Sequence, residues 1–317
     1  KRYGKLKGLT NAVLRKVAAT GPAAWHALRP PRMPKWLRSP LSQAWGNEAM
    51  AIMEIAHFAG APLDLTPLDG DAAALAARVG GSVLPTGSVR LADAGQVSTM
   101  DGYSEGAWWV QDAAAAIPAR ILAPGDGENV LDLCAAPGGK TMQLSAMRAN
   151  VTAVDVSRSR MARVEENLAR VGLKADVRVA DALTLEGEFD AILLDAPCSA
   201  TGTIRRHPDL PHAKDGSEFG ELIDLQARIL DHAWTLLKPG GRLVFCTCSL
   251  LPDEGEVQVE EALKRHPDMS VNRDALGIEG VDPTWTTTEG GLRLRPDYWP
   301  DLGGMDGFYI AVLTKAS

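Results

Sequence analysis

The sequence predicts an α/β fold in which a parallel, doubly wound sheet follows a smaller α+β module. Three observations support this prediction. From residue 112 onward, short apolar runs alternate with helical patterns, as in sheets built from strand–helix–strand units. The helix-to-strand connections are short, as such units require. Four successive apolar runs end at or beside an aspartate, namely Asp132, Asp155, Asp181 and Asp195.

The chain before residue 101 has a different organisation. Residues 9–19 have the apolar spacing of one helix, and Gly21-Pro22 is expected to end it. Residues 29–40 are rich in Pro and Arg and predict a linker. A small α+β module is then expected, with helices over 43–58 and 72–79 and extended segments over 61–67 and 83–89.

The larger sheet is expected to occupy the rest of the chain. Its strands are predicted over 129–133, 151–156, 176–180, 189–195, 242–247 and 308–314. Helices are predicted over 112–122, 140–147, 158–171, 218–237 and 254–265. In open sheets of this kind, ligands bind where the carboxyl ends of the strands meet. The residues just after each strand are therefore the first candidates for a functional site.

Charge is distributed unevenly along the chain. The net charge is −7, yet residues 1–40 contain ten Lys or Arg residues and no Asp or Glu. A one-sided basic stretch on an acidic protein is typical of contact with a polyanion such as RNA. A solvated linker explains the same charges equally well.

Composition also bears on the compartment. No apolar run reaches the length of a membrane span, and the N-terminal region lacks the apolar core of a signal peptide. None of the four cysteines is in the Cys-x-x-Cys spacing of a zinc site. We therefore expect a cytoplasmic protein with free thiols, no disulfide framework and no bound metal. Because the sequence does not begin with Met, we also expect it to be part of a longer protein.

The first candidate site is the segment VLDLCAAPGGKT at residues 130–141. A buried strand ends there, and Gly138 and Gly139 allow a ligand to approach the backbone before a helix begins near Lys140. The segment is neither a dinucleotide-binding GxGxxG nor a phosphate-binding P-loop. Acids at four successive strand ends repel one another. They would suit a ligand that offers hydroxyls, amines and a positive centre, such as S-adenosylmethionine.

Two thiols form the second candidate site. Cys198 follows the strand 189–195 in the sequence PCS, and Cys248 follows the strand 242–247 in the sequence TCS. A thiolate nucleophile is favoured near cations, for which Lys140 and Arg205-Arg206 are candidates. Either cysteine alone is better explained as a small buried apolar residue. Two thiols at matching strand ends favour a catalytic role.

Four segments together resemble a known family. DLCAAPGGKT, AVDVSRSR, DAPCSATGTIRRHPD and FCTCSLLPDEGE are similar to the motifs of the Sun/Nop2-type RNA (cytosine-5)-methyltransferases, most closely its bacterial members that act on 16S rRNA. The resemblance is strong over residues 100–317 and loose over 41–100. It implies a Rossmann-like class I S-adenosylmethionine-dependent methyltransferase domain over 101–317 and a small α+β RNA-binding domain over 41–100. Residues 1–40 would then be a basic helix and linker left from a NusB-like domain.

The resemblance also implies roles for individual residues. S-Adenosyl-L-methionine would be bound by Cys134, Ala135, Ala136, Pro137, Gly138, Gly139, Lys140, Asp155, Arg160, Asp181 and Asp195. Within this set, Asp155 would hold the ribose hydroxyls, and Asp181 would lie near the adenine. The catalytic residues would be Cys248 as nucleophile, Cys198 in product release, Asp195 at the base, and Lys140. Cys246 would be structural, and Leu63–Thr66 stands where the family has an RNA-contacting segment.

These roles agree with the chemistry of cytosine. Carbon 5 is a poor nucleophile, but attack of a thiolate at carbon 6 makes it enamine-like. We therefore expect a monomeric RNA (cytosine-5)-methyltransferase whose substrate is 16S rRNA, with no DNA and no membrane as partner. Two alternatives remain open. One is an S-adenosylmethionine enzyme with a protein or small-molecule substrate, and the other is a ribosome-assembly factor that binds RNA without catalysis.

Overall fold

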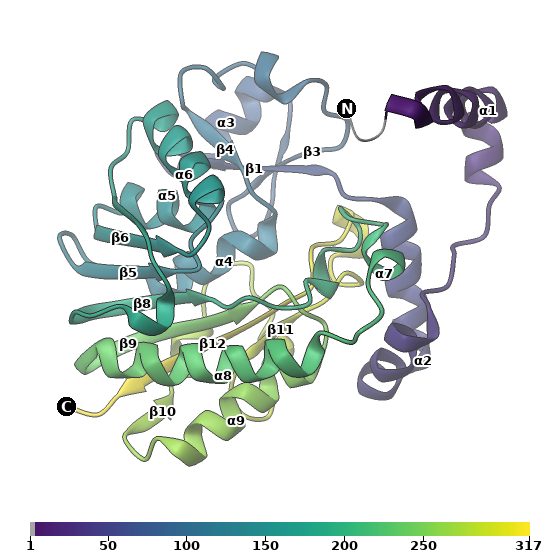
Figure 1. The fold of residues 1–317 in the computed structure, drawn as a ribbon. Coiled ribbons are helices and arrows are strands. Elements are labelled where there is room, and N and C mark those ends of the chain that lie inside the picture. The colour runs from purple at the N-terminus through teal and green to yellow at the C-terminus, as the bar shows by residue number, and fades with distance from the viewer. Residues whose placement is uncertain (1–3) are drawn as a thin grey trace. The chain divides into compact units, whose positions relative to one another are not determined.

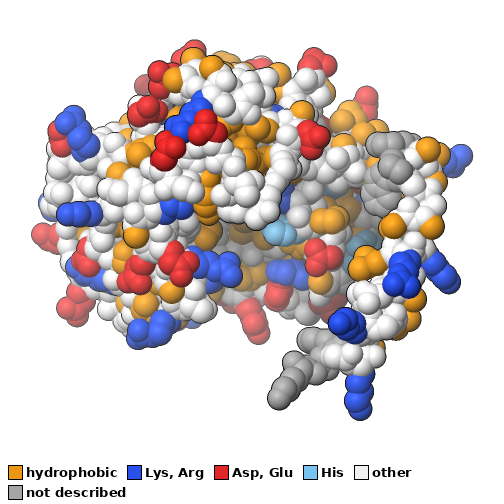
Figure 2. All heavy atoms as spheres, turned by 90° about the horizontal axis from the view of Figure 1, so that it is seen from above, with side chains coloured by type: hydrophobic (Ala, Val, Ile, Leu, Met, Phe, Trp, Pro, Cys, Tyr) orange, Lys and Arg blue, Asp and Glu red, His pale blue; other side chains and the backbone are white. Residues whose placement is uncertain are grey.

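The computed structural model describes residues 4–317, without the side chains of residues 22, 25 and 26. The chain forms two compact units, Lys1–Arg32 and Met33–Ser317. In the first unit, a 3-10 turn at Gly4–Leu6 leads into α1 (Lys7–His26), which is interrupted at Gly21, where φ is 76°. The interruption falls where the sequence predicted the end of the helix. Lys and Arg side chains stand beside hydrophobic ones on this unit (Figure 2).

The second unit opens with α2 (Lys35–Ala59), which begins five residues before the predicted end of the linker. Pro34 occupies the N-cap of α2, and Pro40 lies in its second turn, where it removes the N–H that would bond to the carbonyl of Trp36. The linker prediction over 29–40 was therefore wrong from Lys35 onward. Leu37, Leu41 and Met53 of α2 pack with Ile204 and Leu250, which follow the two thiol segments.

A four-stranded sheet comes next, in the order β2-β3-β1-β4. Its strands are β1 (Leu63–Pro67), β2 (Ser82–Val83), β3 (Val89–Leu91) and β4 (Trp108–Val110). The helix α3 (Ala72–Val79) has the predicted bounds because Asp71 caps it and Gly80 ends it in the left-handed conformation. The predicted extended segment 83–89 is instead a hairpin of β2 and β3. β4 was not predicted, because three residues carry no periodicity.

The large sheet has the order β10-β12-β9-β8-β5-β6-β7, with β11 paired to β12. Its strands are β5 (Asn129–Leu133), β6 (Asn150–Asp155), β7 (Asp176–Val179), β8 (Phe189–Asp195), β9 (Leu237–Thr247), β10 (Met269–Val271), β11 (Leu292–Leu294) and β12 (Phe308–Lys315). Five neighbouring strands, β9, β8, β5, β6 and β7, are parallel. β12 pairs antiparallel with β9, and β10 and β11 each pair antiparallel with β12. The expected parallel sheet is thus confirmed for five strands, and an antiparallel edge completes it.

Helices cover both faces of this sheet (Figure 1). They are α4 (Ala113–Leu122), α5 (Gly139–Ala146), α6 (Arg158–Val171), α8 (Phe219–Leu236) and α9 (Glu256–Arg265). The short helix α7 (Leu210–Ala213) lies beside α2 instead (Figure 1). Ile192 and Leu194 of β8 pack on the side of α8 and α9, whereas Ala191 and Leu193 pack on the side of α4 and α5. Strands buried on both faces must be continuously apolar, which explains the run at 191–194.

None of the helices in residues 4–317 combines the length and apolar character needed to cross a bilayer.

Candidate active site

A cavity of about 1000 Å³ opens at the carboxyl ends of β5, β6, β8 and β9. All but one of the residues that the sequence predicted for the site line it. These are Cys134, Ala135, Ala136, Pro137, Gly139, Lys140, Asp155, Arg160, Asp181, Asp195, Cys198 and Cys248. The exception, Gly138, has a φ of 104°, and a Cβ there would lie 3.2 Å from Cγ1 of Val164 on α6. Gly138 thus shapes the turn from behind the cavity wall.

The turn between β5 and α5 forms one wall. Cys134 has a φ of 61°, and burial, followed by the charges of Asp195 and Asp155, raises the pKa of its thiol to about 12. Cys134 is therefore an uncharged part of the lining. Asp132 is fully buried behind the turn, where its Oδ2 accepts a 2.5 Å hydrogen bond from Thr141 Oγ1. Burial raises the pKa of Asp132 to about 7. Of the four strand-end acids, Asp132 alone does not line the cavity.

Asp155 and Asp181 lie at the β6 and β7 side of the cavity. Asp155 is 5% exposed. Its Oδ1 accepts from the Ser157 N–H at 2.8 Å, and its Oδ2 accepts from Arg160 at 2.8 Å. Asp181 is exposed and accepts from the Leu183 N–H at 3.0 Å. Val156, which follows Asp155, is 72% exposed although it is apolar, and it also lines the cavity.

Lys140 and Asp195, which both line the cavity, form an ion pair. Lys140 Nζ lies 2.7 Å from Asp195 Oδ2, and the Lys140 side chain is only 9% exposed. Burial alone would lower the pKa of Lys140, but the negative charge of Asp195 and its other anionic neighbours raise it above its ordinary value. Cys246 Sγ lies 3.6 Å from Asp195 Oδ1 and outside the cavity lining. Burial raises the pKa of Cys246 well above its ordinary value, so this thiol stays uncharged.

The two predicted thiols meet beside this ion pair. Cys198 Sγ lies 3.5 Å from Cys248 Sγ. They come together because β8 and β9 are parallel neighbours, with Asp195 paired to Cys246 at the last register position. The hydrogen bond to Cys248, and then burial, raise the pKa of Cys198 well above its ordinary value. The thiol of Cys198 therefore stays protonated and can donate a hydrogen bond to Cys248.

Residues 119–314 match the family described as 16S rRNA methyltransferase RsmB/F. The chain belongs to this family. It is 38% identical to ribosomal RNA small subunit methyltransferase B of Erwinia tasmaniensis, over 98% of this chain and 74% of that relative.

Two solved structures have a similar fold. A methyltransferase homologue from Pyrococcus horikoshii has a TM-score of 0.69 and 28% identity, over 91% of this chain and 100% of that one. NSun6 from the same organism, solved with SFG, has a TM-score of 0.76 and 19% identity, over 90% of this chain and 99% of that one. Because the identity of this chain to NSun6 is only 19%, this similarity shows a shared fold. The class I methyltransferase fold expected from the sequence is therefore confirmed.

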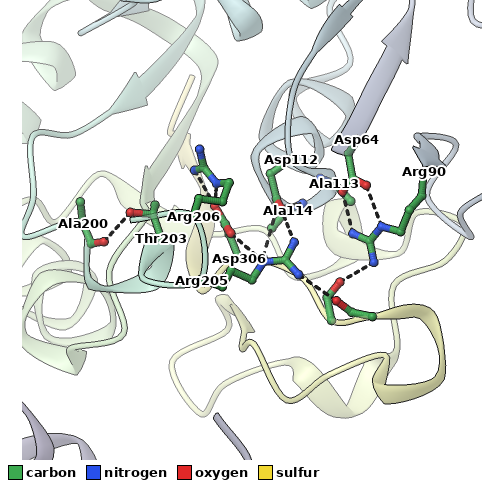
Figure 3. A network of polar contacts seen from close by, with 12 residues as sticks. Asp64, Arg90, Asp112, Ala113, Ala114, Ala200, Thr203, Arg205, Arg206 and Asp306 are labelled. Atoms are coloured by element: carbon green, nitrogen blue, oxygen red, sulfur yellow. Dashed lines mark hydrogen bonds and ion pairs between the residues drawn. The ribbon is translucent and has the colours of Figure 1, made fainter. Parts of the chain in front are cut away.

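Of the two arginines considered as cations near the thiols, only Arg206 lines the cavity. Arg205 is fully buried, 2.5 Å from Asp112 and 2.9 Å from Asp306. Arg206 is 39% exposed and donates from Nε to Asp306 Oδ2 at 2.6 Å. Figure 3 shows both arginines converging on Asp306. Asp306 was missed in the sequence because nothing near it marks a site and its partners lie about a hundred residues away.

The segment Leu63–Thr66 has structural contacts. Asp64 is buried and accepts hydrogen bonds from Arg90 at 2.6 Å and from the Ala113 N–H at 3.0 Å. Thr66 donates to Gln111 Oε1 at 3.0 Å. Asp64 and Arg90 appear at the other end of the network in Figure 3. Because Arg90 also donates to the carbonyls of Leu302 and Gly304, this segment joins the small sheet to the loop before β12.

Proposed function

We propose that this chain transfers a methyl group from S-adenosyl-L-methionine to carbon 5 of a cytosine in 16S rRNA, in the cytoplasm, through a covalent adduct with Cys248. The observation that carries the proposal is the pair of sulfur atoms 3.5 Å apart beside the Lys140–Asp195 ion pair. A methyltransferase acting on an oxygen, or on a nitrogen that already carries a lone pair, has no need of such a thiol pair. Membership of the RsmB/F family supports rRNA as the substrate.

The residues at the β5 and β6 side of the cavity suit S-adenosylmethionine. Asp155 has one bond on each carboxylate oxygen, so each oxygen retains acceptor capacity for a ribose hydroxyl. The exposed apolar side chain of Val156 offers a surface for the adenine. Gly139 leaves the backbone accessible at the amino end of α5. The cofactor supplies an electrophilic methyl group.

The chain's own residues would then act on the target base. Cytosine must be unpaired or flipped out of its stack to enter the cavity. Cys248 first loses its proton to water, and Cys198 donates a hydrogen bond to the resulting thiolate. The thiolate then forms a bond to carbon 6 as the π electrons between carbons 5 and 6 move into the ring. Asp195, held by Lys140, accepts a hydrogen bond from the exocyclic amine and orients the pyrimidine. The positive charge of Lys140 stabilises the negative charge that develops on the ring.

Product release requires two further events at the base. The proton on carbon 5 must pass to a base, and the bond between Cys248 and carbon 6 must break. We assign Cys198 to this stage because its sulfur is beside Cys248. The raised pKa keeps Cys198 protonated during the attack. After Cys198 gives its own proton to water, its thiolate accepts the proton from carbon 5, and the electrons of that C–H bond restore the ring double bond as Cys248 leaves as a thiolate.

The proposal is tested by methyl transfer from labelled S-adenosylmethionine to deproteinised 16S rRNA, followed by mapping of modified nucleotides. We expect 5-methylcytosine at one position. Label on a nitrogen or a ribose oxygen would contradict the covalent mechanism, and label on a protein substrate would favour the alternative enzyme class.

A further inference from the structure

Glu254 is a fully buried carboxylate that no part of the proposed mechanism uses. It lies in the 3-10 turn η5 (Pro252–Glu254) and has no exposed surface. Four donors satisfy it. Its Oε1 accepts from the Ser199 N–H at 2.8 Å and from Gln226 Nε2 at 3.0 Å, and its Oε2 accepts from Ser199 Oγ at 2.5 Å and Ser249 Oγ at 2.6 Å.

This carboxylate has no cationic partner among residues 4–317. Burial of a charged group is costly unless hydrogen bonds replace its water. The carboxylate of Glu254 is therefore stable in this position only because serine and glutamine donors surround it. A well-packed apolar side chain would fill the same space with a smaller desolvation free energy. Stability alone therefore does not explain why a carboxylate occupies this position.

The donors to Glu254 come from the two loops that carry the thiols. Ser199 directly follows Cys198, and Ser249 directly follows Cys248. The last register pair of β8 and β9 is Asp195 with Cys246, and a hydrogen bond from the Ala196 N–H to the Cys246 carbonyl extends it by one position. Beyond that point the sheet no longer fixes one loop against the other.

We propose that Glu254 is the positioning residue that holds Cys198 and Cys248 at their 3.5 Å separation. Through its two oxygens Glu254 joins Ser199 to Ser249 and links both to Gln226 of α8. Weaker links also join the loops. Gly202 donates its N–H to the Cys248 carbonyl at 2.9 Å, Ser199 Oγ lies 3.3 Å from Ser249 Oγ, and Thr201 contacts Ser249 and Leu250.

The inference rests on the proposed function, in which both thiols act on one bound base. Cys248 bonds to carbon 6, and Cys198 serves the step at carbon 5, so both sulfurs must reach adjacent ring atoms without the base moving. A displacement of about 1 Å in such a site can lower a rate about 100-fold. Glu254 itself touches neither sulfur among the hydrogen bonds of the described residues.

The test measures thiol separation directly, without RNA or cofactor. Dibromobimane joins two thiols only when both lie within its short reach, and the joined peptide is identified by mass spectrometry. The variants are Glu254→Ala, Glu254→Gln and Ser249→Ala. Gln258→Ala is the matched control, since Gln258 is also buried nearby but bonds to the Ile223 carbonyl of α8 at 3.0 Å and not to the thiol loops.

We expect the bridged Cys198–Cys248 peptide in the parent chain and in Gln258→Ala, and its loss in Glu254→Ala in favour of singly alkylated thiols. Glu254→Gln should restore part of the bridging, because the amide can still accept at one oxygen and donate to a serine hydroxyl. In methyl transfer to 16S rRNA, Glu254→Ala should lower kcat about 100-fold with little change in KM.

The proposal is overturned if folded Glu254→Ala bridges its thiols as the parent does, or if Gln258→Ala loses bridging equally. Should Glu254→Ala fail to fold, Ser249→Ala decides the matter in the same way, since it removes one arm of the cluster and keeps the acid. If bridging depends on Glu254 but the parent chain transfers no methyl group, the proposed function fails and the positioning role stands.

Discussion

Asp155→Ala removes the side chain that we expect to hold the cofactor ribose. In the structure each carboxylate oxygen of Asp155 already accepts one hydrogen bond, from the Ser157 N–H and from Arg160, both at 2.8 Å. One acceptor position per oxygen is left for a ribose hydroxyl. A hydrogen bond to a charged group contributes about 1.5–3 kcal/mol. The two bonds to the ribose replace bonds to water and share one carboxylate. We therefore expect Asp155→Ala to lose about 1.5–3 kcal/mol of binding free energy in total, which raises Kd roughly 10- to 150-fold.

Isothermal calorimetry with S-adenosylmethionine measures this loss. Asp155→Asn is the conservative comparison, since it keeps one oxygen acceptor and should fall between the parent and Asp155→Ala. Arg160→Ala should weaken binding less, because the Arg160 side chain is 54% exposed and exposed ion pairs contribute about 0–1 kcal/mol. Equal cofactor affinity in the parent and in folded Asp155→Ala would remove Asp155 from the site.

The other predictions concern pH, RNA and charge. Burial raises the pKa of Asp132 from 3.8 to about 7, so between these pH values the folded state keeps a proton that the unfolded chain has lost. The free energy of unfolding should therefore fall as pH rises through this range. If Asp132→Asn shows the same slope of unfolding free energy against pH as the parent, this prediction is contradicted. Arg206→Gln should reduce the slope of log RNA affinity against log salt concentration by about 1, and an unchanged slope would remove Arg206 from RNA contact. Arg205→Gln should instead lower the free energy of unfolding by about 3–5 kcal/mol in urea titrations. Arg32→Gln with Lys35→Gln should also flatten the salt slope, and if it does not, the basic segment is a tether.

The elements with strong local signals were predictable. α3 and β8 have the predicted bounds because a capping aspartate, a left-handed glycine or a buried apolar run fixed each end. The thiol pair was predictable for a related reason. Once β8 and β9 are parallel neighbours, the residues just beyond them must meet.

What the sequence did not disclose depends on contacts between distant segments. Asp306 holds Arg205 and Arg206 from a hundred residues away, and Glu254 reaches Ser199 across 55 residues. No periodicity or spacing connects such positions. The antiparallel strands β10 and β11 are three residues long, too short for an alternating pattern to distinguish them from a loop.

The measurement that tests the account most directly separates the two thiols. Cys248→Ala and Cys198→Ala are each incubated with 16S rRNA and S-adenosylmethionine and run on a denaturing gel. Cys248→Ala should be inactive and form no adduct, because it lacks the attacking sulfur. Cys198→Ala should attack and methylate but stall before release, giving a slowly migrating protein–RNA band that needs both RNA and cofactor. A band with Cys248→Ala instead would exchange the two roles, and full activity with no band in either variant would contradict the covalent mechanism.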